Sequence, residues 1–280
     1  DCDRADTQQD TIFFRPPPTG TPTLAAELRN EDHGHTFRYD HVVEERSDQG
    51  EVFDLIGQPV VDAALAGVNA TVFAYGQTGS GKTHTMHGDA ESAQLAGLTP
   101  RLLQAIFAAA EARPEAKISV QCSYVELYNE SFRDLLGEDS AAPAANTFGT
   151  TPSRAGNATP REQAAAAAAA PGIRLREDVK RGVYVEGLEE VTVRSCEEAQ
   201  QLLVLGNSQR TTAATAANTD SSRSHSIFTV SVVCEQQRNG LTIYKRAKVN
   251  LVDLAGSERQ KQTQASKQRL REAQHINKSL

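Results

Sequence analysis

Residues 76–83 read Gly-Gln-Thr-Gly-Ser-Gly-Lys-Thr, a complete phosphate-binding loop of the form G-x-x-x-x-G-K-[ST]. The apolar run TVFAY at 71–75 precedes the loop and predicts a buried strand, and a helix is predicted to begin at Lys82. The motif therefore has the strand–loop–helix context that phosphate binding requires. Its glycines let the backbone turn N–H groups toward phosphate oxygens, and the helix N-terminus adds a favourable dipole.

Two side chains of the loop are predicted to meet the charge of a nucleotide. The ammonium of Lys82 is expected at the β- and γ-phosphates, and the hydroxyl of Thr83 is expected on Mg²⁺. The alternative is a glycine-rich turn that matches by chance, which the fixed positions and the preceding strand disfavour. The predicted nucleotide contacts in the loop are Gly76, Gln77, Thr78, Gly79, Ser80, Gly81, Lys82 and Thr83.

Residues 253–258 predict a sensor for the γ-phosphate. They read Asp-Leu-Ala-Gly-Ser-Glu and follow the apolar run VNLV, which is typical of a strand. An Asp at the end of a strand, far along the chain from a phosphate loop, is the usual second anchor of Mg²⁺. Gly256 can offer an unhindered backbone N–H to a γ-phosphate, so Asp253 and Gly256 are predicted site residues.

The order of three motifs resembles the kinesin motor domain. GQTGSGKT at 76–83, NTDSSRSH at 218–225 and DLAGSE at 253–258 are similar to the phosphate loop, switch I and switch II of that family. Further matching segments are FRYDHVV (37–43), SYVELYNE (123–130), RDLL (133–136), SIFTVSV (226–232) and EAQHINKSL (272–280). LREDVKRGVYVEG and SERQKQT are most similar to the class-twelve kinesins of spindle and phragmoplast, whereas EAQHINKSL also resembles minus-end kinesins.

The resemblance implies a microtubule-dependent motor ATPase with ATP and Mg²⁺ as its ligands. It implies that Ser222 helps to hold Mg²⁺, that Ser221 orients the lytic water, and that Asp253 reaches the metal through water. Arg223 and Glu258 are expected to form the salt bridge that closes the switches, with a static surface pair as the alternative. The catalytic residues predicted in this way are Ser221, Ser222, Arg223, Gly256 and Glu258, and the metal ligands are Thr83, Ser222 and Asp253.

The remaining nucleotide contacts also follow from the resemblance. Asn218 is expected at the γ-phosphate, and Arg15, Pro16 and His84 are expected around the adenine base. His225 is expected to support switch I and not to act as a general base.

The chain departs from the family pattern at several places. Phe13 stands where the family usually has an Arg, and Lys267 stands where it usually has a Gly. The chain ends at Leu280, early in the expected switch II helix, and lacks an initiating Met. We therefore expect a motor domain whose C-terminal part is missing.

The alternation of apolar runs predicts an α/β, three-layer P-loop NTPase fold with a central, mostly parallel or mixed sheet flanked by helices. Helices are expected over 49–67, over 99–113 with Thr99 as N-cap, and from a capping box at Ser195 and Glu198 to a stop at Gly206. Strands are expected at 12–16, 36–39, 117–127, 226–235 and 242–252, with a polar turn at 236–241, and LREDVKRGVYVEG is hairpin-like.

Three segments define the expected domain organisation. Residues 1–10 are polar and predict a disordered end, and residues 11–280 form the motor domain. Residues 137–171 are rich in Ala, Thr, Pro and Gly and predict a disordered, low-complexity insertion that follows a short helix.

Charge and composition indicate the partners. The net charge is −7, but Arg259, Lys261, Lys267, Arg269 and Arg271 form a run without acidic residues, which predicts a contact with acidic microtubules. Lys180-Arg181 is a second candidate contact. Four scattered cysteines indicate reduced thiols, and no long apolar stretch or signal segment indicates a membrane or export. We expect a cytoplasmic, cytoskeletal protein that forms a homodimer through a stalk outside this chain, with neither nucleic acid nor membrane as partner.

Two functions from other classes are the alternatives. A kinesin-like adaptor that binds nucleotide and tubulin without turnover would be favoured by the loss of a switch residue, and none is lost. A P-loop GTPase would carry a guanine-specificity N-K-x-D motif, whereas residues 277–280 read Asn-Lys-Ser-Leu.

Overall fold

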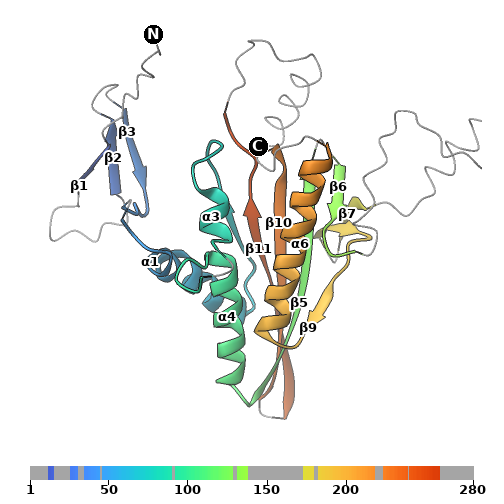
Figure 1. Ribbon diagram of the computed structural model, residues 1–280. Coiled ribbons are helices and arrows are strands. Elements are labelled where there is room, and N and C mark those ends of the chain that lie inside the picture. Colours follow the sequence, from blue (N-terminus) through green and yellow to red (C-terminus); the bar gives the residue numbers. More distant parts are fainter. Residues whose placement is uncertain are drawn as a thin grey trace, which may run out of the picture. The chain divides into compact units, whose positions relative to one another are not determined.

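The computed structural model describes residues 12–15, 26–30, 35–44, 46–89, 92–128, 131–137, 173–179, 182–217, 223–238 and 240–258. The chain divides into two units, residues 1–48 and residues 49–280. In the first unit, β1 (Ile12–Arg15), β2 (Ala26–Asn30) and β3 (His35–Tyr39) form an antiparallel sheet in that order (Figure 1). The strands predicted at 12–16 and 36–39 are thereby confirmed.

The second unit is built on a mixed sheet. Its strands are β4 (Ala70–Ala74), β5 (Ala116–Tyr128), β6 (Ser131–Asp134), β9 (Val191–Val193), β10 (His225–Arg238) and β11 (Leu241–Asp253). The order is β4-β11-β10-β5-β6, and β9 also pairs with β5. Among the strands that the structure describes in this sheet, the β4–β11 pair is parallel and the other pairs are antiparallel. The β-branched runs predicted as strands are therefore strands, and the predicted mixed sheet is confirmed.

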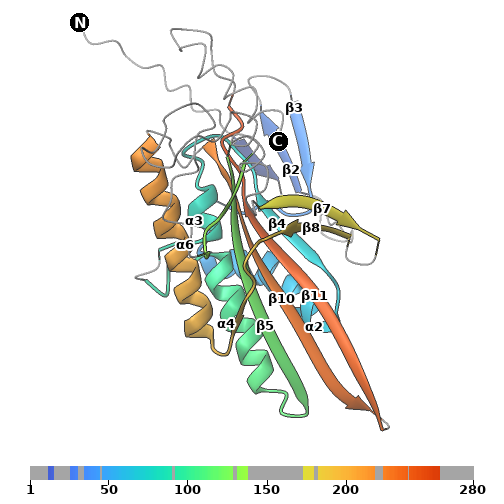
Figure 2. The same cartoon turned by 90° about the vertical axis from the view of Figure 1, so that its right-hand side faces the viewer.

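Helices cover one face of this sheet. Helix α1 (Gln49–Val52) continues through a π-helical turn, η1 (Phe53–Gly57), into α2 (Gln58–Ala66). The others are α3 (Lys82–Met86), α4 (Leu98–Glu111) and α6 (Cys196–Ala217). Figure 2 shows α4 and α6 side by side against β5 and β10. The helix predicted over 49–67 is confirmed, and the π-helical turn within it was not expected.

The core lies between these helices and the sheet. Leu102, Leu103 and Ile106 of α4 are fully buried, as is Tyr124 of β5. The Tyr124 ring meets Phe228 of β10 edge to face, with centroids 5.2 Å apart. Fully burying one such apolar side chain stabilises the fold by about 1.5–3 kcal/mol, so this layer fixes how the helices sit on the sheet.

The prediction of a fully buried strand at 71–75 is wrong for one of its faces. Val72 and Ala74 pack against the core, but the side chain of Phe73 is 62% exposed. The cause is the place of β4, which lies at the end of the described sheet order and alternates between a covered face and an open one.

The stop predicted at Gly206 is also wrong, because α6 continues to Ala217. A Cβ at Gly206 would collide with the ring of Tyr124, so this glycine allows a close approach of helix and strand and does not end the helix. One of the two bonds of the predicted capping box is present, since the Glu198 N–H donates to Ser195 Oγ at 3.2 Å. The Glu198 carboxylate accepts the N–H of Arg194, one residue before the predicted donor Ser195, at 2.8 Å.

Three smaller expectations also need correction. Helix α4 begins two residues earlier than predicted, with Gly97 and not Thr99 at its N-cap. The short helix expected before the insertion is β6 followed by bends. The turn expected at 236–241 is shorter, because Arg238 pairs directly with Leu241.

The hairpin predicted at 175–187 is confirmed, since β7 (Arg174–Asp178) pairs antiparallel with β8 (Gly182–Glu186). Its Lys180-Arg181 tip lies outside the described residues, as do the predicted end at 1–10, all of the insertion except Gly137, and everything after Glu258. None of the described helices combines the length and the apolar character needed to cross a membrane.

Candidate nucleotide-binding site

The phosphate loop joins β4 to α3 in the second unit. Because β4 and β11 are parallel, with Ala74 opposite Asp253, both strands end at the same edge of the sheet. Gly79 and Gly81 have φ angles of 80° and 89°, in the left-handed region that favours glycine. The ammonium of Lys82 donates to the carbonyl oxygens of Gly76 and Gln77, both at 2.9 Å, so the cation is held inside the loop.

The predicted metal anchors Thr83 and Asp253 meet. The Thr83 hydroxyl donates to Asp253 Oδ2 at 2.7 Å, although 170 residues separate them in the sequence. Asp253 is buried, and its Oδ1 has no hydrogen-bond partner among the residues that the structure describes. A hydroxyl beside a buried carboxylate with an unused oxygen fits Mg²⁺, which prefers oxygen ligands and keeps several of its waters. The third predicted ligand, Ser222, lies outside the described residues.

A buried arginine that the sequence analysis missed holds the same carboxylate. Arg210 Nη1 lies 3.1 Å from Asp253 Oδ2 and also donates to Ser226 Oγ at 3.1 Å. Its Nε lies 3.6 Å from a carboxylate oxygen of Glu126. Arg210 belongs to the part of α6 beyond Gly206, which the sequence analysis placed outside the helix. If the helix had been predicted to continue through Gly206, Arg210 would have been placed one helical turn after that glycine, on the side that faces the sheet.

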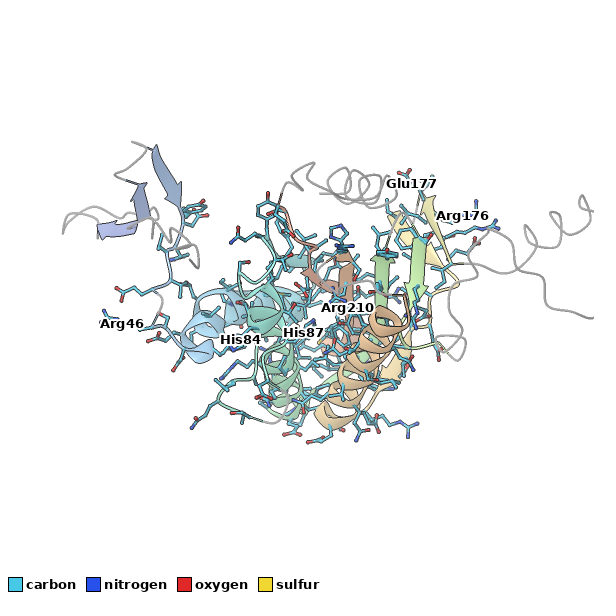
Figure 3. All side chains as sticks on the ribbon, turned by 45° about the horizontal axis from the view of Figure 1, so that its top comes forward. Arg46, His84, His87, Arg176, Glu177 and Arg210 are labelled. Atoms are coloured by element: carbon cyan, nitrogen blue, oxygen red, sulfur yellow. The ribbon has the colours of Figure 1, made fainter. Side chains whose placement is uncertain are left out.

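Two histidines lie beside this network, and Figure 3 shows His87 and Arg210 on neighbouring elements. His225 Nδ1 accepts the backbone N–H of Ala255 at 3.0 Å, which ties the start of β10 to the DLAGSE segment. Burial, followed by the nearby Arg210 charge, lowers the pKa of His225, while Asp253 acts in the opposite sense. A neutral ring that accepts an N–H supports the prediction that His225 braces the switch.

His87 ends α3 and is buried against Tyr124. Its Nε2 lies 3.5 Å from the Tyr124 hydroxyl, which in turn donates to Asn207 Oδ1 of α6 at 2.7 Å. Burial is the main reason that the pKa of His87 falls to about 4, with Arg210 lowering it further and Asp253 raising it. The phosphate-loop helix and α6 are therefore connected through neutral groups.

Glu258 contacts the phosphate loop directly. Its Oε2 accepts the Thr78 backbone N–H at 2.9 Å, and its Oε1 accepts the Thr78 hydroxyl at 2.6 Å. The hydrogen bond from the Thr78 side chain is the main reason that the pKa of Glu258 is lowered. Both carboxylate oxygens of Glu258 thus contact Thr78, and the predicted Arg223–Glu258 pair stays a prediction.

The predicted adenine contacts are divided between the two units. Arg15 is in β1 of the first unit, and Pro16 and Asn218 lie outside the described residues, as does Ser221. His84 lies in α3, and Gln49 Nε2 lies 2.8 Å from its carbonyl oxygen and 3.0 Å from its ring Nδ1. Gln49 is a second residue that sequence analysis missed, and it lies 35 positions away from its partner.

Comparisons with known proteins agree with one another. The family model described as kinesin motor domain matches residues 4–280. The Kinesin-like protein KIN-12B of Arabidopsis thaliana is 42% identical over 260 residues, which is 88% of this chain and 18% of that protein. The Kinesin-like protein KIN-12E of Oryza sativa subsp. japonica is 40% identical over 255 residues, which is 87% of this chain and 12% of that protein.

A solved structure described as that of a fast kinesin, with implications for ATPase mechanism and interactions with microtubules, is 33% identical with a TM-score of 0.75. The match covers 96% of this chain and 66% of that one. The present chain spans less than a fifth of the two curated relatives. Sequence, fold and the meeting of the phosphate loop with the DLAGSE segment lead to the same assignment, and the chain belongs to the kinesin motor domain family.

Proposed function

We propose that this chain is the ATP-hydrolysing core of a microtubule motor. The observation that carries the proposal is the 2.7 Å bond between the Thr83 hydroxyl and the Asp253 carboxylate, which joins the phosphate loop to the γ-phosphate sensor. The names of the similar proteins, which include a kinesin structure described by its ATPase mechanism and microtubule contacts, support the same proposal.

Phosphoryl transfer chiefly requires positioning and neutralisation of charge. Mg²⁺, when bound, would neutralise charge between the β- and γ-phosphates. Lys82 supplies the cation inside the loop. Thr83 and Asp253 would hold the metal, Asp253 through water. Arg210 fixes Asp253 from the side of α6. In this proposal Gly256 and Asn218 contact the γ-phosphate, Ser222 completes the metal site and Ser221 orients the attacking water.

The surroundings of this centre complete the proposal. His84 of the second unit contacts the adenine base, and Arg15 and Pro16 stay predicted adenine contacts. The basic run from Arg259 to Arg271 and the Lys180-Arg181 tip contact microtubules, because basic loops dock acidic polymers. Arg223 and Glu258 pair when the switches close. The site of action is the cytoskeleton, with spindle and phragmoplast suggested by the class-twelve resemblance, and the active form is a stalk-mediated homodimer.

Phosphate release by the intact protein, with and without microtubules, tests the proposal. ATP should be hydrolysed, and microtubules should raise the rate. Lys82→Ala should abolish ATP binding, because the phosphates lose their main cation, whereas Lys117→Ala on the exposed surface of β5 should not. Unchanged ATP affinity in Lys82→Ala would contradict the phosphate-loop assignment. Microtubule binding without any turnover would favour the adaptor.

A further inference from the structure

An acidic side chain of the chain itself occupies donors of the phosphate loop. Thr78 is the third residue of that loop, and it gives its backbone N–H and its hydroxyl to the two oxygens of Glu258, at 2.9 and 2.6 Å. Backbone N–H groups and hydroxyls of such a loop are the donors that bind phosphate oxygens. The Glu258 carboxylate therefore occupies donors of Thr78 that could otherwise bind a phosphate group.

The surrounding backbone holds Glu258 in this place. The Ser257 N–H donates to the Gly76 carbonyl at 3.1 Å, and the Leu254 N–H donates to the Ala74 carbonyl at 3.3 Å. These bonds lay the DLAGSE segment along the loop. A Cβ at Gly256 would collide with both the Glu258 carboxylate and the Thr78 hydroxyl, so the contact depends on glycine at 256. The contact is thus supported by residues on both segments.

We propose that the Glu258 carboxylate competes with nucleotide phosphate for the phosphate loop, and that Thr78 is the positioning residue that holds Glu258 there. This inference rests on the proposed function. A nucleotide phosphate and a carboxylate cannot both take the same two donors, and each repels the other beside Lys82. Entry of the nucleotide then releases Glu258 from Thr78.

Two roles of Glu258, competing with nucleotide or bracing the loop, predict opposite changes in nucleotide affinity when Glu258 is removed. If Glu258 only braces the loop, then removing it loosens the loop and weakens nucleotide binding. If Glu258 competes, then removing it opens the loop and strengthens binding. If the Glu258–Thr78 contact is made in about four fifths of the molecules, only the remaining fifth can bind nucleotide. The apparent nucleotide affinity is then about fivefold lower than that of the open loop.

ADP is the suitable probe, because it has no γ-phosphate with which to close the switches. Its affinity and association rate should be measured in the intact protein for wild type, Glu258→Ala, Thr78→Val and the double variant. Glu190→Ala is the matched control, because it removes an exposed carboxylate that lies 3.9 Å from Lys248, outside the loop. Thermal unfolding of each variant shows whether the fold is kept.

Glu258→Ala should bind ADP about fivefold more tightly and faster, and Glu190→Ala should not. Thr78→Val removes a donor that both Glu258 and phosphate use, so in the wild-type background its effect on ADP affinity should be smaller than that of Glu258→Ala. In the Glu258→Ala background the same change should weaken ADP binding, because only the contact with phosphate is then lost. The inference is overturned if Glu258→Ala binds ADP equally or more weakly, or if Glu190→Ala gains as much. Absence of ADP binding by wild type would overturn the proposed function itself, and the inference with it.

Discussion

The Arg210 guanidinium lies 3.1 Å from the Asp253 carboxylate, and both side chains are almost excluded from solvent. This pair joins α6 to the end of β11, where the candidate metal site is. Removing one partner of a buried pair is costly, because it leaves the other charge without compensation.

Arg210→Met should therefore destabilise the fold by about 3–5 kcal/mol, measured by urea unfolding. Arg210→Lys should be intermediate, because it keeps the charge and loses the planar fork that reaches both Asp253 and Glu126. Arg176→Met is the control: Arg176 lies 2.9 Å from Glu186, but both side chains are about half exposed, so little change is expected. Equal effects of the two Met variants would contradict the structural role of Arg210.

Gly206→Ala should destabilise the protein, although the same change in most helices stabilises by about 1 kcal/mol. The added methyl group would meet the Tyr124 ring, and such overpacking costs about 1–3 kcal/mol. Thermal unfolding of Gly206→Ala, Tyr124→Ala and the double variant checks this. The double variant should lose less than the sum of the single variants. A stabilised Gly206→Ala would show that the helix and strand can move apart at no cost.

Stability should depend on pH through His87. Its pKa is lowered by burial from 6.5 to about 4, so between these values the unfolded chain binds a proton that the folded chain does not. The stabilisation from this group is complete above about pH 6.5 and falls by at most about 3 kcal/mol as the pH drops to 4. Urea unfolding of wild type and His87→Gln should be measured from pH 7.5 to 4.5. The carboxylates are common to both proteins, so the difference between the two unfolding free energies reports on His87 alone. Parallel curves would show that His87 does not titrate as stated.

Replacing Lys261, Lys267 and Arg269 together by Ala should weaken microtubule binding, most strongly at low salt. Exposed charges act through long-range attraction, which a Debye length of about 10 Å at 0.1 M salt already limits. Hydrolysis without microtubules should change little, because none of the three is assigned to phosphate or Mg²⁺. Co-sedimentation over a salt series is the measurement, and replacing the exposed Lys117, Lys245 and Arg246 together by Ala is the control of equal charge. If the two triple variants behaved alike, the contact would have to lie elsewhere, for example at Lys180-Arg181.

The phosphate loop, its strand and its helix could be predicted from sequence because their spacing is fixed by local geometry. The long strands could be predicted because β-branched residues cluster there. The length of α6 could not be predicted, since Gly206 resembles a helix end until Tyr124 is known to lie against it. Arg210 was missed for the same reason. The contact between Glu258 and Thr78 depends on how two loops meet, which no local pattern records.

The parallel pairing of β4 with β11 has a consequence for how the protein is made. Asp253 follows Thr83 by 170 residues, which a ribosome adds in roughly 10–30 s. Throughout that interval the nascent chain carries a complete phosphate-loop sequence without its metal anchor and without the partner of the strand before it. Non-local pairings of this kind form slowly, and unpaired apolar strands are prone to aggregation. The nucleotide site is therefore complete only after Asp253 has been added to the chain, so the folding of this centre is a late event of synthesis.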